Sequence, residues 1–201
     1  MIRSTRIAAL MVAVMATSAC TLLATPEPVQ LYRFGGAAGE SYAARTATPV
    51  DVTLRRVEFP QAVGGDRILG MTGTQAAYIA GARWIAPARG LYSEAVETAF
   101  AEQAVRVRLI GQREVTPGAK LLDIDVQSFE ARYDVPGGSP VVVISVRVRM
   151  LKPDRTITAE RIFQASIPAA ENRVSAIVSA FDAAIATVNT EIVAWTDTNA
   201  G

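Results

Sequence analysis

Alternating apolar and polar residues predict most of the extended segments of this chain. Over residues 140–150 every second side chain is apolar, and serine or arginine occupies several of the intervening positions. Because successive side chains of a strand point to opposite faces, this pattern is typical of a strand with one buried and one solvated face. Similar patterns and turn signals predict strands over 50–60, 105–110, 121–133 and 156–167, and a hairpin made by 67–71 and 75–80.

Two other segments follow the helical period. Pro87 suits the first turn of a helix, and apolar residues then recur at helical spacing over 88–103. The second helix has a longer apolar stripe, from Val174 to Trp195, whose members are three or four residues apart. Such stripes usually pack into a core, with a groove for a partner as the alternative. We therefore predict an α+β domain with two amphipathic helices packed on one face of a mostly antiparallel sheet.

The amino terminus has the layout of a secretory signal peptide. Arg3 and Arg6 precede an apolar segment over 7–16, and small residues follow it. This apolar segment is too short to span a membrane, because a spanning helix needs about 20 residues. The sequence therefore predicts that the protein is exported.

The single cysteine, Cys20, directly follows the small residues of the expected cleavage site. This position resembles a bacterial lipobox, although Thr17 stands where a large aliphatic residue is usual. We predict that residues 1–19 are removed as a lipoprotein signal peptide and that Cys20 is acylated, which would anchor the mature chain to a membrane. The alternative is an ordinary signal peptide cut after Ala19 or Ala24.

The mature chain divides into three parts. Residues 20–49 contain prolines and glycines with little periodicity, which is typical of a tether. Within them, a short alternating piece near 31–34 is expected to add an edge strand to the sheet, with a partner contact as the alternative. Residues 50–196 carry the main strands and helices and are expected to form the α+β domain, and residues 197–201 are expected to be a tail.

Composition restricts the chemistry that this chain can perform. It contains one cysteine and no histidine, which excludes Ser-His-Asp catalysis, zinc sites with histidine ligands and an intrachain disulfide. Its formal charge of +1 becomes −1 without residues 1–19, because two basic residues and no acidic residue are removed. A nucleic-acid-binding protein usually carries a basic surplus, and no phosphate-binding motif is present. We therefore expect no enzyme activity, cofactor, metal or nucleic-acid partner.

Asp123 and Asp125 are the candidate chemical groups. Being two residues apart on one strand, they point to the same face and could in principle bind a metal or act as acid and base. We favour the interpretation that they line the solvated face of the sheet opposite Arg106 and Arg108 of an adjacent strand. Cross-strand charge pairs of this kind are common and contribute only about 0.2–1 kcal/mol. We therefore assign no catalytic residue.

Several short motifs carry a family resemblance. They are Arg67-Ile68-Leu69, the segment Ala77-Tyr78-Ile79-Ala80-Gly81-Ala82-Arg83-Trp84, the helix end Glu97-Thr98-Ala99-Phe100, Phe129-Glu130-Ala131-Arg132-Tyr133, Ala159-Glu160-Arg161-Ile162-Phe163, and Ala180-Phe181-Asp182-Ala183-Ala184. Together with the lipobox, they resemble the ABC-type transport auxiliary lipoproteins, the PqiC-like family, over about residues 31–195. The segment 77–84 is the most specific part. The chain departs from the family at 120–122, where relatives often have an Asp-Tyr pair before the strand.

The resemblance implies a lipid-anchored periplasmic subunit of a lipid transport system that supports envelope integrity. The implied partners are the ABC transporter ATPase and permease and a substrate-binding subunit of the mammalian-cell-entry type. By resemblance to enteric lipoproteins, Thr21 in place of an aspartate after the cysteine favours the outer membrane. Trp84 and the adjoining strands are the expected contact surface, with a core or cap position for Trp84 as the alternative, and homo-oligomerisation is left open.

Two other functions are retained as alternatives. One is an outer-membrane lipoprotein that binds cell-wall or envelope-assembly proteins and has no role in transport. The other, which is the weakest, is hydrolysis by Asp123 and Asp125. An anchor, a tether and a domain without catalytic groups suit a docking subunit better than an enzyme.

Overall fold

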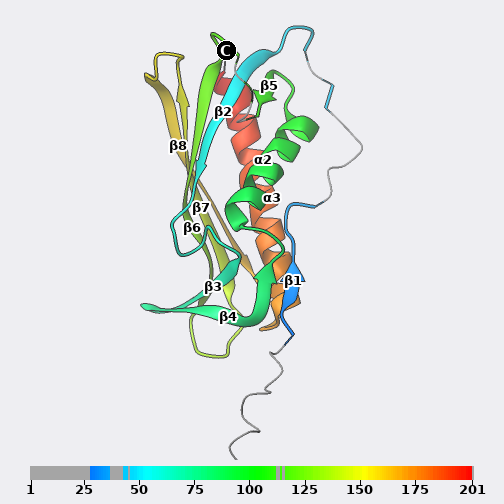
Figure 1. The fold of residues 1–201 in the computed structure, drawn as a ribbon, viewed down its shortest axis with the longest axis vertical. Helices are drawn as coiled ribbons and strands as arrows, with labels where there is room; N and C mark the ends of the chain where they lie inside the picture. The colour runs from blue at the N-terminus through cyan, green and yellow to red at the C-terminus, as the bar shows by residue number, and fades with distance from the viewer. Residues whose placement is uncertain (1–27, 37–42, 45, 112–113, 115, 201) are drawn as a thin grey trace, which may run out of the picture.

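The computed structural model describes residues 28–36, 43–44, 46–111, 114 and 116–200. Within these residues the chain forms one eight-stranded sheet and two helices (Figure 1). The elements in chain order are β1 (Gln30–Tyr32), β2 (Val50–Glu58), β3 (Arg67–Thr72), β4 (Gln75–Trp84), α2 (Ala88–Gln103), β5 (Val107–Ile110), β6 (Lys120–Tyr133), β7 (Val141–Leu151), β8 (Ile157–Pro168) and α3 (Val174–Asn199).

The sheet is mixed, and β6 is its branch point. Along one edge, the first half of β6 pairs in parallel with β2 and its last residues pair in parallel with β3. Along the other edge, β6 pairs antiparallel with β7. In addition, β1 pairs in parallel with β4, and β5 pairs in parallel with β2. The prediction of a mostly antiparallel sheet is therefore wrong, because four of the seven described strand pairs are parallel.

The parallel pairs follow from the order of the elements along the chain. Strands that are consecutive in the chain and joined by short loops form the antiparallel pairs β3–β4, β6–β7 and β7–β8. Between β2 and β6 lie a hairpin, α2 and β5, which make the kind of long crossover that parallel pairing requires. The predicted antiparallel meander is therefore confirmed for β6, β7 and β8, whereas β5 lies outside it.

Both helices lie on the same side of the sheet (Figure 1). The helix α2 has the predicted bounds, and α3 buries the predicted apolar stripe against β7 and β8. Fully burying one large apolar side chain contributes about 1.5–3 kcal/mol, so this stripe is a major source of stability. Among the described residues, α3 is also long and apolar enough to cross a membrane, and 56% of its most apolar window is buried within the domain. This burial is typical of the core helix of a folded domain.

The folded domain extends beyond the predicted range of 50–196 at both ends. Near the amino terminus, β1 pairs with β4 and Phe34 is only 2% exposed. The edge strand predicted near 31–34 is therefore present, but it starts one residue earlier and ends two residues earlier than predicted. This part of the predicted tether belongs to the folded core. At the other end α3 continues to Asn199, and Ala200 is buried. The expectation of a tail over 197–201 is wrong for the described residues 197–200, because Asp197 accepts backbone N–H groups at the start of β5 and the carbonyl of Ala200 accepts a hydrogen bond from Lys120 of β6.

Candidate functional site

Cys20, the predicted lipidation site, lies outside the described residues, as does the predicted signal peptide over 1–19. The described chain begins at Pro28, eight residues after Cys20. An extended chain spans at most about 3.3–3.6 Å per residue, so acylation of Cys20 would hold Pro28 within about 30 Å of the membrane. β1, which follows directly, lies at the end of the domain opposite the carboxyl terminus (Figure 1).

The surface beside β1 exposes several apolar side chains. Val29 is 47% exposed, and Leu31 and Ile85 are each 57% exposed. The backbone N–H of Ile85 donates a hydrogen bond of 2.8 Å to the carbonyl of Tyr32, which places Ile85 next to the strand. The end of the domain that would face the anchor is therefore partly apolar.

Trp84 is a core residue and does not lie on a surface. It is 1% exposed, and its ring meets those of Phe34, Phe129 and Phe181 at centroid distances of 4.8, 6.3 and 5.4 Å. The assignment of Trp84 as a contact residue is therefore wrong, and the alternative of a core position holds. The physical reason is that β1 and Phe34 cover the end of β4, which the sequence pattern leaves open.

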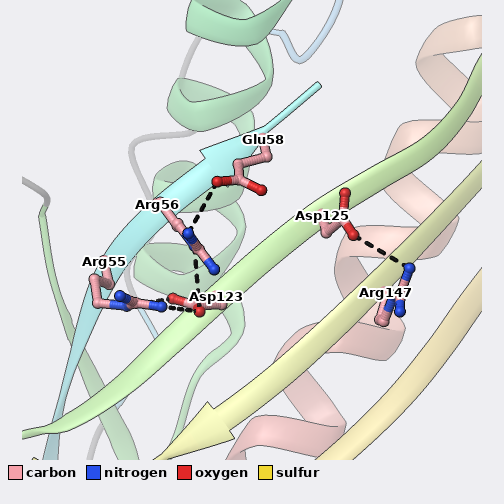
Figure 2. Close-up of polar contacts among 6 residues, drawn as sticks. All are labelled: Arg55, Arg56, Glu58, Asp123, Asp125 and Arg147. Carbon is pink, nitrogen blue, oxygen red and sulfur yellow. Dashed lines mark hydrogen bonds and ion pairs between the residues drawn. The ribbon is translucent and has the colours of Figure 1, made fainter. Parts of the chain in front are cut away.

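Asp123 is buried within an arginine cluster on β2 and β6 (Figure 2). It is 1% exposed, and its carboxylate accepts hydrogen bonds from Arg55 Nε at 2.7 Å and from Arg55 Nη2. Arg56 Nε lies 3.3 Å from Asp123 Oδ2. A β-bulge between Leu54 and Arg56 lets two consecutive arginines reach one carboxylate. The hydrogen bonds to Asp123 raise the pKa of the Arg55 guanidinium.

Asp125 shares this face of the sheet but is more exposed, and its carboxylate lies 3.4 Å from Arg147 of β7. Neither aspartate faces Arg106 or Arg108, because β2 separates β5 from β6. Arg108 instead donates two hydrogen bonds of 2.7 Å to Asp51 on β2, and they lower the pKa of the Asp51 carboxyl. The predicted cross-strand pairing with β5 is therefore wrong in its partners, and Asp123 does not line a solvated face.

The geometry supports a structural role for the aspartate pair. Both carboxylate oxygens of Asp123 are engaged by guanidinium groups, and the side chain is nearly inaccessible to a substrate. Among the described residues, no group of three or more histidine, cysteine, aspartate or glutamate side chains could hold a metal ion. A buried ion pair of this kind is costly to break, since removing one partner leaves an uncompensated charge.

Sequence reasoning missed two polar residues of α3. Asp197 accepts hydrogen bonds from the backbone N–H groups of Val105, Arg106 and Val107 at 2.8, 3.1 and 2.9 Å, and so ties the end of α3 to the start of β5. Asn189 is 3% exposed and lines a groove between α2 and α3. The available signal for Asn189 was its position beside Val188 in the apolar stripe, where a polar residue needs a partner.

The sequence matches one protein family over most of its length. The family model described as the ABC-type transport auxiliary lipoprotein component matches residues 32–193. No match was found among curated proteins.

Two solved structures resemble the fold. A crystal structure of a protein from Xanthomonas campestris has a TM-score of 0.66 and 23% sequence identity, and the similarity covers 85% of this chain and 96% of that chain. The crystal structure of an uncharacterized protein has a TM-score of 0.64 and 17% identity, and covers 77% of this chain and 97% of its own. At these identities the two structures show a shared fold.

Proposed function

The chain belongs to the family of ABC-type transport auxiliary lipoprotein components, and we propose that it serves a lipid transport system of the mammalian-cell-entry type. In this role it is anchored through Cys20 on the periplasmic side of the outer membrane. There it docks the transport machinery and supports envelope integrity. Its partners are the ATPase and permease of the ABC transporter and the mammalian-cell-entry-type substrate-binding subunit.

The observation that carries this proposal is the position of Cys20 relative to the family match. The match begins at residue 32, and the described fold begins at β1, so the cysteine precedes the domain by a short segment. A cysteine acylated at this point would bring the apolar surface of Val29, Leu31 and Ile85 close to the membrane. The opposite end of the domain, where the carboxyl terminus lies, would point away from the membrane and toward partners (Figure 1).

The domain suits docking better than energy transduction. The sequence has no Walker motif, so the energy for transport must come from another subunit. Its acidic candidates, Asp123 and Asp125, are engaged with arginines of neighbouring strands. What the domain offers to a partner is therefore surface: an exposed strand β4, the groove between α2 and α3, and the apolar surface beside β1.

The anchor is tested by labelling cells with radioactive palmitate and separating membrane from soluble fractions. We expect the wild-type protein to incorporate label and to fractionate with the outer membrane. The Cys20→Ser variant should incorporate none and should leave the membrane fraction. Thr21→Ser is a matched control next to the lipobox that should behave as wild type. A wild-type protein that is unlabelled and soluble would overturn the anchored role.

The transport role is tested separately by affinity purification of the lipidated protein after chemical cross-linking in cells. Recovery of the ATPase, permease or mammalian-cell-entry-type subunit supports the proposal. Recovery of cell-wall or envelope-assembly proteins alone would overturn the transport role and would support the alternative of a lipoprotein without a role in transport.

A further inference from the structure

The apolar surface beside β1 is formed by Val29, Leu31 and Ile85, which share the outward face of β1 and of the end of β4. Leu31 lies opposite Arg83 in the parallel pair of these strands. Val29 precedes Leu31 by two residues and Ile85 follows Arg83 by two, so strand alternation places them on the same face. Their exposure agrees with this, because Val29 is 47% exposed and the other two are each 57% exposed.

The inward face of the same strands already belongs to the core. Phe34, Ala82 and Trp84 alternate with the outward residues and are all buried. A shift of either strand by one residue would bury the outward side chains only by exposing this set. The apolar surface beside β1 therefore stays exposed unless a partner outside the domain covers it. Apolar side chains gathered at one place on a surface often mark a contact with a protein or a membrane.

This surface lies close to the predicted anchor. Val29 is nine residues after Cys20. An extended chain spans at most about 3.3–3.6 Å per residue, so acylation of Cys20 would keep Val29 within about 30 Å of the bilayer. β1 lies at the end of the domain opposite the carboxyl terminus (Figure 1). The bilayer is therefore the partner that the anchor would bring within reach of this surface.

The charged groups beside the apolar surface are balanced. Arg83 pairs with Asp66 at 2.8 Å and Arg33 pairs with Glu94 at 2.9 Å, and all four side chains are exposed. Attraction to anionic lipid requires a basic surplus, which these pairs do not provide. The favourable term for contact with a membrane is therefore the burial of apolar area among headgroups and acyl chains.

We infer that the apolar surface beside β1 is a second membrane contact, which inserts at the headgroup level of the bilayer that holds the anchor. This inference rests on the proposed acylation of Cys20. Three side chains bury too little area to hold a free domain on a membrane. An anchored domain needs less, because the tether makes the contact intramolecular and raises the effective concentration of the bilayer. The anchor thus keeps the protein on the membrane, and the apolar surface sets which side of the domain faces it.

The contact is tested with a fluorescent label on the full mature chain, acylated and reconstituted in vesicles of phosphatidylethanolamine and phosphatidylglycerol. Cys20 is the only cysteine of the chain. Once it is acylated, the cysteine of a Leu31→Cys variant is the only free thiol, and it takes a nitrobenzoxadiazole label. We expect lipids with a nitroxide near the headgroup to quench this label several-fold more than the same label in Ile157→Cys.

Ile157 is a matched control for exposure, because it is 49% exposed. It begins β8, whereas the other end of β8 approaches β3 through β7 and β6. The label at residue 157 is therefore held far from β1 and β4. A docked domain keeps this label in water, whereas a domain that turns freely on its tether does not fix its orientation.

Substitution of a second apolar residue shows whether burial causes the quenching, because the tether and the label at residue 31 stay the same. Ile85→Glu should lower the ratio of docked to undocked domains about tenfold, since it loses the burial of roughly half an isoleucine side chain. Ile85→Leu and Ile157→Glu should each leave quenching unchanged. Both substituted side chains are exposed, so none of these variants should affect folding. Added sodium chloride should also have little effect, because the contact is not ionic.

The outcomes separate the contact from the anchor. Equal quenching at residues 31 and 157, or quenching at residue 31 that Ile85→Glu leaves unchanged, would overturn the membrane contact and leave the anchored role intact. Shielding of the label that depends on protein concentration and not on nitroxide lipid would show that a second copy covers the surface, which also overturns the inference. A wild-type protein that takes up no palmitate would overturn the anchored role and this contact together.

Discussion

The carboxylate of Asp197 joins the end of α3 to the start of β5, so its removal should destabilise the whole domain. It accepts three backbone N–H groups, at distances between 2.8 and 3.1 Å. Hydrogen bonds to a charged group contribute about 1.5–3 kcal/mol each when they are buried. Val105 and Arg106 are exposed, so water replaces much of their interaction, whereas Val107 is fully buried. We therefore expect Asp197→Ala to lower the free energy of unfolding by about 2–4 kcal/mol.

The assay is urea unfolding of the full mature chain, followed by far-ultraviolet circular dichroism. The midpoint should fall while the dependence on urea stays the same, since the folded and unfolded surfaces change little. Asp197→Asn keeps one acceptor oxygen and should give an intermediate loss. Glu191→Ala removes an exposed carboxylate from the same helix and should change stability by less than about 0.5 kcal/mol. If Asp197→Ala is as stable as the Glu191 variant, residues 197–200 behave as a tail and the reasoning fails.

Two further predictions concern ion pairs on the sheet. Asp123→Asn should lower the free energy of unfolding by about 1–3 kcal/mol in urea titrations, because the buried amide replaces a carboxylate that accepts charged hydrogen bonds from the partly exposed Arg55. Asp125→Asn, whose pair is more exposed, should lose less than about 1 kcal/mol. Equal losses in the two variants would contradict the difference in burial between the two aspartates. Arg108→Gln should destabilise slightly at neutral pH, and the difference from wild type should vanish in acid. The pKa of the Asp51 carboxyl is lowered in the folded state, so the stabilisation by its pair with Arg108 is present above about pH 4 and is lost as the pH falls through that folded pKa. A difference in stability between Arg108→Gln and wild type that persists in acid would exclude Asp51 as the cause.

The local parts of the fold could be predicted from the sequence because their signals are local. The bounds of α2 and the alternation in β7 follow from side-chain periodicity over a few residues. Parallel pairing of β2 with β6 could not be predicted in this way, because it joins segments more than 60 residues apart. The bulge at Arg55 also breaks the alternation of β2, so the strand looks less regular in the sequence than it is in the sheet.

For polar residues within buried elements, the sequence predicts the position but not the hydrogen-bond partner. Periodicity shows that Asp123 and Asn189 interrupt apolar segments, but their partners come from distant segments and depend on the tertiary fold. For Asp123 the fold supplies two arginines from β2. For Asn189 the described residues supply no hydrogen-bond donor to its side-chain oxygen, and the buried Trp84 Nε1 and the Tyr92 hydroxyl likewise have no partner. Periodicity therefore locates a buried polar residue, whereas only the tertiary fold decides whether that residue is paired.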